Sequence, residues 1–258
     1  MHPVAPAPEF SLSRRERIFI GACIAGIVLL AWAYLFYLDR QMATAMAGMK
    51  MRQPWGLADF LFTYAMWVVM MIGMMAGSAA PVVLLFAAAH ARRDSRRLPL
   101  IVLAFGLGYL LAWTGFSLGA TLAQWLLHRA ALLSPQMALH SSQAGGGVLI
   151  AAGIYQMTSL KRACLRHCQS PLGFLMARWR DGLAGALQMG WRHGVYCLGC
   201  CWALMGVLFV VGVMNLAWVA LLAGFILLEK VGPAGVTVAR VAGAAMIAAG
   251  AMLLAAVM

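Results

Sequence analysis

Five of the six cysteines in this 258-residue sequence lie within two short runs. The run C-L-G-C-C occupies residues 197–201, and the run C-L-R-H-C occupies residues 164–168 and includes His167. Cysteine is a small apolar residue that buries well, so a single buried cysteine indicates only packing. Two runs within 38 residues favour metal or redox chemistry over packing.

The spacing in and before the second run predicts a shared helix face. In a helix that includes residue 193, His193, Cys197 and either Cys200 or Cys201 follow one another at steps of four, three and four. The runs match no standard zinc-finger spacing, and the position of the histidine in C-L-R-H-C excludes covalent haem attachment. Two functions therefore remain open: binding of a soft metal ion, or a membrane oxidoreductase that is either metal-dependent or uses thiol-disulfide exchange between the two runs.

Methionines form a third pattern. Met66, Met70 and Met74 recur at steps of four, with Met71 and Met75 beside them. Such a stripe is typical of packing in a membrane helix. Thioether clusters also suit Cu(I), so the stripe is a second candidate site and favours copper over zinc or iron.

Glu229 ends a short apolar run, and its role has two interpretations. It pairs with its neighbour Lys230 at the membrane interface, or it faces the cysteines and completes a metal site. The candidate metal ligands are Cys197, Cys200, Cys201, Cys164, Cys168, His193, His167, Glu229, Met70, Met71, Met74 and Met75. No nucleotide fingerprint or paired-carboxylate set is evident, so the sequence leaves open whether the protein is an enzyme.

The composition of the chain predicts the kind of fold that positions these residues. Hydrophobic residues make up 64% of the chain and charged residues 10%, against about 25% charged in a soluble domain. This composition predicts an all-α, polytopic membrane bundle in contact with lipid. The net charge of +12 lies in short loops between apolar runs, which favours a role in membrane orientation and excludes nucleic acid as a partner.

Apolar runs of spanning length predict about seven transmembrane helices. A flexible basic tail at residues 1–17 precedes a single transmembrane domain at 18–258, and an amphipathic helix at 172–189 is expected to lie on the membrane surface between helices four and five. The predicted spans are 18–38, 57–90, 98–127, 144–160, 196–214, 215–228 and 236–257.

The positive charges predict the orientation. In this arrangement fifteen of the nineteen Lys and Arg residues fall on one side of the membrane, which predicts an amino terminus inside and a carboxyl terminus outside. All the cysteine and histidine candidates and Glu229 then lie at the cytoplasmic ends of their helices, and the two cysteine runs are expected to meet. Cytoplasmic thiols stay reduced, so stable disulfides are not expected.

The sequence also resembles a known family. The run G-I-Y-Q-M-T-S-L-K-R-A-C-L-R-H-C-Q-S-P at 153–171, the core C-L-G-C-C-W-A-L-M, the ending L-E-K and the methionine-rich helix before S-A-A-P resemble an uncharacterised bacterial family of predicted metal-binding integral membrane proteins. The resemblance covers residues 57–257. The sequence departs from the family pattern at Ala76, Gly77 and Ser159. It implies a multi-pass protein of the bacterial inner membrane with a metal site, and copper-dependent oxidoreductase activity for some members. A soluble protein that donates or accepts the metal is the expected partner.

Overall fold

The computed structural model describes residues 12–46, 55–91, 97–134 and 137–256. Over these residues the chain is helical, and its only β-type pairing is one isolated bridge between Leu133 and Leu139. The all-α prediction is confirmed. The helices are α1 (Arg14–Met46), α2 (Leu57–Ala91), α3 (Leu98–Arg129), α4 (Ser142–Met157), α5 (Ser159–Gln169), α6 (Pro171–Arg178), α7 (Gly182–Val211), α8 (Leu216–Val231) and α9 (Gly235–Ala255).

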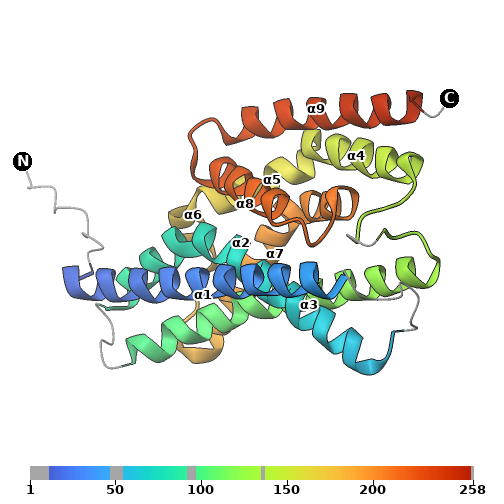
Figure 1. Cartoon of the computed structure of the whole chain (residues 1–258). Coiled ribbons are helices and arrows are strands. Elements are labelled where there is room, and N and C mark those ends of the chain that lie inside the picture. The colour runs from blue at the N-terminus through green and yellow to red at the C-terminus, as the bar shows by residue number, and fades with distance from the viewer. Residues whose placement is uncertain (1–11, 47–54, 92–96, 135–136, 257–258) are drawn as a thin grey trace, which may run out of the picture.

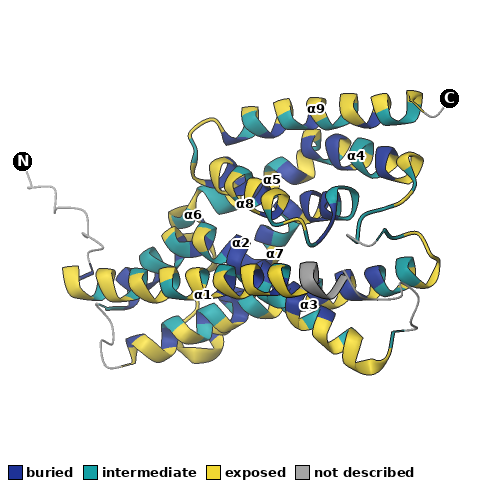
Figure 2. Ribbon diagram, viewed as in Figure 1, coloured by how far each residue is buried: buried dark blue, intermediate teal, exposed yellow. Residues whose placement is uncertain are grey.

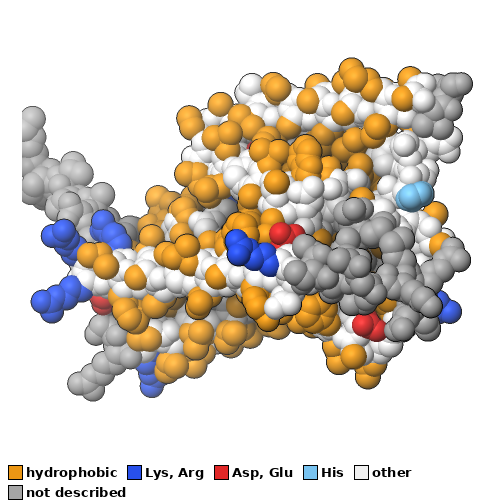
Figure 3. Space-filling view, viewed as in Figure 1, with side chains coloured by type: hydrophobic (Ala, Val, Ile, Leu, Met, Phe, Trp, Pro, Cys, Tyr) orange, Lys and Arg blue, Asp and Glu red, His pale blue; other side chains and the backbone are white. Residues whose placement is uncertain are grey.

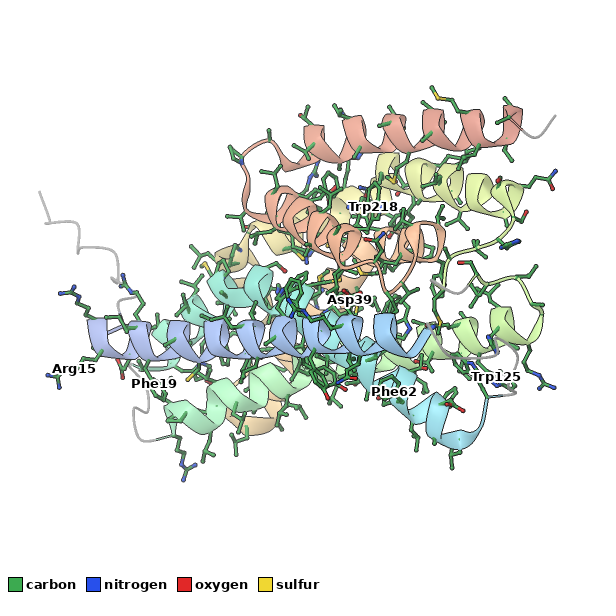
Figure 4. All side chains as sticks on the ribbon, in the orientation of Figure 1. Arg15, Phe19, Asp39, Phe62, Trp125 and Trp218 are labelled. Carbon is green, nitrogen blue, oxygen red and sulfur yellow. The ribbon has the colours of Figure 1, made fainter. Side chains whose placement is uncertain are left out.

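The helices lie roughly along one direction and reverse at their ends (Figure 1). The chain runs along α1, returns along α2, runs again along α3, returns through α4, α5 and α6, and then follows α7, α8 and α9. The start of α1 and the end of α9 therefore lie at opposite ends of the bundle. Figure 4 shows Arg15 at one of these ends and Trp125 toward the other.

Among the described residues, five helices are long and apolar enough to cross a membrane: α1, α2, α3, α7 and α9. The predicted spans at 144–160 and 215–228 correspond to α4 and α8, which have 16 residues each and so extend only about 24 Å, less than the hydrocarbon layer. The structure thus replaces two of the seven predicted spans with short helices. After α4 the chain turns at Thr158, where the backbone is extended and the side chain caps α5 by accepting the N–H of Lys161.

The predicted surface helix at 172–189 is wrong. The chain forms α6, breaks at residues 179–181 and starts α7 at Gly182, whose φ of 80° favours glycine. At the break the Trp179 indole donates to the Asp181 carboxylate. Because α7 begins at Gly182 rather than at residue 196, residues 197–201 lie in the middle of a 30-residue helix rather than at its end.

The basic tail also differs from expectation. Arg14, Arg15 and Arg17 belong to the first turns of α1, and Ser13 precedes them with its hydroxyl and N–H bonded to the Glu16 carboxylate. Residues 1–11, which make up the rest of the predicted tail, lie outside the described residues.

Glycines allow two pairs of helices to pack closely. A Cβ placed on Gly190 of α7 would overlap the backbone of Phe105 in α3, and one on Gly108 would overlap the backbone of Leu187. On the other side of the bundle, a four-glycine contact joins α4 to α9. Close packing of this kind is common between membrane helices. The glycines of the α4–α9 contact are Gly146, Gly153, Gly243 and Gly250.

Large apolar side chains cover the outside of the bundle. Figure 2 shows exposed residues along the outer face of α1, where Phe19, Leu29 and Leu30 are 68%, 70% and 73% exposed. Figure 3 shows many hydrophobic side chains on this face, with Lys and Arg side chains mostly at its left end and a further group near its middle. Exposed apolar side chains in such numbers mark contact with lipid or another apolar partner.

Candidate metal centre

Four sulfur atoms from three helices form a continuous row, here called the sulfur cluster, which is buried except at the partly exposed Cys168. The Cys168 and Cys200 Sγ atoms are 4.0 Å apart, and the Cys200 and Cys201 Sγ atoms are 3.7 Å apart. The Cys201 Sγ lies 4.0 Å from the Met75 Sδ of α2. The two cysteine runs therefore meet, as the sequence predicts.

Gly199 explains why the C-L-G-C-C run tolerates α5 so close to α7. A Cβ at Gly199 would lie 2.8 Å from the Cys164 Sγ, well inside van der Waals contact. The Tyr155 hydroxyl of α4 donates to the Gly199 carbonyl. Gly199, which has no side chain, thus allows both α4 and α5 to contact α7 at one position. The contact with Cys164 of α5 sets the distance between the two cysteine runs.

Cys197 lies beside the sulfur cluster and has its own polar partners. Its Sγ is 2.9 Å from the Lys230 Nζ and 3.1 Å from the Tyr109 hydroxyl oxygen. Lys230 also donates to the Ser78 hydroxyl at 3.1 Å, and its Nζ lies 3.8 Å from the Met75 Sδ. With an exposure of only 6%, Lys230 is a cation held among sulfur and hydroxyl groups.

Glu229 pairs with Lys161, so neither of its predicted roles is found. The Lys161 Nζ donates to the Glu229 carboxylate at 2.8 Å, with side-chain exposures of 0% and 1%. Gln156 donates to the other carboxylate oxygen at 2.9 Å, and Gln169 donates to the Glu229 backbone carbonyl at 2.8 Å. Neighbouring residues on a helix point in different directions, so Glu229 and Lys230 face different partners.

The methionine stripe is buried, and one of its members reaches the sulfur cluster. Met66, Met70, Met71, Met74 and Met75 are at most 4% exposed and belong to one apolar core. Met75 contacts Cys201, as given above. The stripe is therefore continuous with the cysteines rather than a separate site.

The two predicted histidine ligands pack against aromatic rings. The His193 ring is buried among Phe105, Tyr109 and Phe174, and its Nδ1 has no hydrogen-bond partner within the described residues. His167 is exposed on α5, where its ring stacks on Tyr196 at a centroid distance of 4.2 Å and its Nδ1 faces the carbonyl of the preceding turn. The contacts that define the sulfur cluster thus come from thiol and thioether groups.

The sulfur spacing can be compared with that of a metal site. Two thiolates bound at about 2.3 Å to one ion at tetrahedral or trigonal angles are roughly 3.8–4.0 Å apart, which matches the spacings in the cluster. Within the described part of the chain, however, no group of three or more His, Cys, Asp or Glu side chains is arranged to hold a metal ion. The six cysteines are free thiols, and burial raises the pKa of Cys164 above its ordinary value.

Several residues at the centre were not among the sequence candidates. Lys161 and Lys230 were counted among the loop charges that set orientation, yet both are buried. The signal for them was their position at the edge of apolar runs, where a charge needs a partner. Tyr109, Ser78 and Gln156 carry no comparable signal in the sequence.

The fold and the site together define a helical bundle of membrane-spanning length around a buried sulfur-lined centre. A family model described as PpoB2, copper chaperone, matches residues 64–253, which is most of the chain. The chain belongs to this family. No curated protein and no solved structure matches it. The family match links the chain to copper and carries no information on membrane insertion or oxidoreductase activity.

Proposed function

We propose that this protein is an integral protein of the bacterial inner membrane that binds Cu(I) at the sulfur cluster. The observation that carries the proposal is the unbroken row of sulfur atoms from Cys168 through Cys200 and Cys201 to Met75, with neighbouring separations of 3.7–4.0 Å. Membership of a copper chaperone family supports the choice of metal.

The chemistry of the row favours Cu(I) over zinc or iron. Thiolate and thioether ligands select soft ions, and a thioether is a poor ligand for Zn²⁺. The Glu229 carboxylate is engaged by Lys161 and is not part of the row. Binding requires only small side-chain movements, since the sulfurs already have the spacing of ligands on a shared ion.

The half-buried thiols give copper a route into the cluster. Cys164 and Cys168 lie on α5 and are partly exposed, whereas Cys197, Cys200 and Cys201 are each 1% exposed. A soluble copper donor or acceptor would therefore exchange its metal at α5. The seven-span arrangement predicted from the sequence places α5 on the cytoplasmic side, where most of its positive charges lie, and that orientation stays a prediction.

Metal analysis of the purified protein tests the proposal. The protein is loaded with Cu(I) under reductant, separated from free metal and compared with a Cys200→Ser, Cys201→Ser double variant. The matched control is Cys23→Ser, since Cys23 is an exposed free thiol on α1. We expect copper in the wild type and the control and its loss in the double variant. Equal copper in all three proteins would refute the site.

Thiol-disulfide exchange is the second candidate, and the 4.0 Å separation of the Cys168 and Cys200 Sγ atoms favours it. Closing that disulfide would give two electrons and two protons to an acceptor. If exchange is the function, Cys200→Ser should leave Cys168 free to form a trapped mixed disulfide, visible on a non-reducing gel in metal-free protein. We expect loss of copper without a trapped species.

A further inference from the structure

Contacts at two places fix how α2 faces α7. Met75 of α2 meets Cys201 of α7 through their sulfur atoms at 4.0 Å, and Trp67 of α2 stacks on Phe209 of α7 with ring centroids 5.5 Å apart. The two contacts are eight residues apart on each helix and run in opposite directions, so the helices are antiparallel in this register. Met71 is therefore opposite Met205, midway between the two contacts.

Thioethers fill the layer between these contacts. Met71 and Met205 are 0% exposed, and Met205 follows Cys201 by one helical turn. Met70 and Met74 lie beside them in the same apolar core. The methionine layer, defined as Met70, Met71, Met74, Met75 and Met205, thus begins at the sulfur cluster and ends at the Trp67–Phe209 stack.

A polar group lies beyond the stack, at the other end of the layer. The Trp67 indole donates to the Gln124 side-chain oxygen at 2.7 Å, and the Gln124 amide nitrogen lies 2.7 Å from the Met137 Sδ. Gln124 is fully buried, whereas Met137 is half-buried in the segment after α3. A further thioether therefore lies where the route would reach the opposite end of the bundle.

We propose that the methionine layer is a relay that carries Cu(I) from the sulfur cluster across the bundle toward Met137. This proposal rests on the proposed copper function and adds transport to it. In each step one copper–sulfur bond forms as another breaks, first from Cys201 to Met75 and then to Met71 and Met205. Copper stays Cu(I), so no electron is gained or lost. Trp67 can stabilise the ion at the end of the layer through its ring face.

Lys230 is placed to block the relay when no copper is moving through it. Its ammonium lies 2.9 Å from the Cys197 Sγ and 3.8 Å from the Met75 Sδ, at the junction between thiols and thioethers. A copper ion bound to the Met75 sulfur and the Lys230 ammonium would be two positive charges a few ångströms apart. In a low-dielectric interior they repel each other strongly. Copper can therefore pass beyond Met75 only when Lys230 moves away from the Met75 Sδ, toward Ser78, to which it already donates at 3.1 Å.

Transport into vesicles tests the relay. The full-length protein is reconstituted into liposomes that contain a Cu(I)-specific chelator, Cu(I) is supplied outside under reductant, and luminal copper is followed over time. The test variant is Met71→Leu, Met205→Leu, because leucine keeps the volume and removes the sulfur. The control is Met189→Leu, which changes a buried methionine in a different apolar cluster.

We expect the wild type and the control to fill the vesicles and the double variant to fall to the rate of protein-free vesicles. The double variant should still bind copper in detergent as the wild type does, because its thiols are intact. Transport by the double variant at the wild-type rate would overturn the relay. Wild-type protein that binds copper but moves none would also overturn it and leave the proposed function standing, whereas a wild type that binds no copper would refute the proposed function itself.

Discussion

Breaking the buried Lys161–Glu229 pair from one side should destabilise the protein strongly. The change is Lys161→Met, which removes the ammonium and leaves the Glu229 carboxylate with Gln156 as its side-chain donor. The two side chains are 0% and 1% exposed, so solvent cannot screen the remaining charge. The relevant range is therefore the loss of about 3–5 kcal/mol seen for buried pairs, rather than the ~0–1 kcal/mol of surface pairs.

The double variant Lys161→Met, Glu229→Gln separates charge from packing. It removes both charges and keeps a polar group next to Gln156, so most of the lost stability should return. Unfolding is followed in detergent by circular dichroism against denaturant. Arg166→Met is the matched control, because Arg166 is an exposed cation on the same helix, and it should change stability by less than about 1 kcal/mol. A single variant as stable as the control would refute the reasoning, as would a double variant no better than the single one.

Three further outcomes are expected. Gly199→Ala should push α5 away from α7 through its contact with the Cys164 Sγ at 2.8 Å and weaken Cu(I) binding in a competition titration, whereas Gly206→Ala, with open space around it, should not. Gly190→Ala should cost about 1–3 kcal/mol of stability through overpacking, measured by denaturant unfolding, while Gly115→Ala, also in open space, should be neutral. A membrane-impermeant thiol reagent should label Cys164 in inverted vesicles and not in intact cells; because burial raises its pKa, the thiolate fraction and the labelling rate should increase as the pH rises.

The fold class and most helix positions follow from local properties of the sequence. Apolar runs of spanning length coincide with α1, α2, α3 and α9 because a run of about 20 apolar residues is enough to form a spanning helix, whatever it packs against. The start of α7 was missed, since residues 172–189 are largely apolar apart from Arg178, Arg180 and Asp181, and the break depends on Asp181 and Gly182. A glycine after an aspartate is a recognised turn signal, and greater emphasis on it would have moved the cysteines to mid-helix.

The partners of the charged residues could not be predicted from the sequence. Glu229 and Lys230 are adjacent, so a local salt bridge was the simplest expectation. The actual partner of Glu229 is 68 residues earlier in the chain, on a helix whose direction depends on the turn at Thr158. Likewise, Lys230 finds Cys197, 33 residues earlier. Long-range pairings of this kind depend on how short helices dock, which no local pattern specifies.

The short helices and the buried charges have a common explanation. Helices α4 and α8 are too short to span, and their ends near Thr158 and Gly232 bring polar backbone groups into the bundle. Irregular backbone at membrane depth is stable only where protein or a polar cavity surrounds it. Here the Lys161 ammonium pairs with the Glu229 carboxylate, and Lys230 donates to Ser78 and lies beside the Cys197 Sγ. The same breaks place α5, with its two partly exposed cysteines, against the buried cysteines of α7, so an arrangement that is costly for stability is the one that assembles the sulfur cluster.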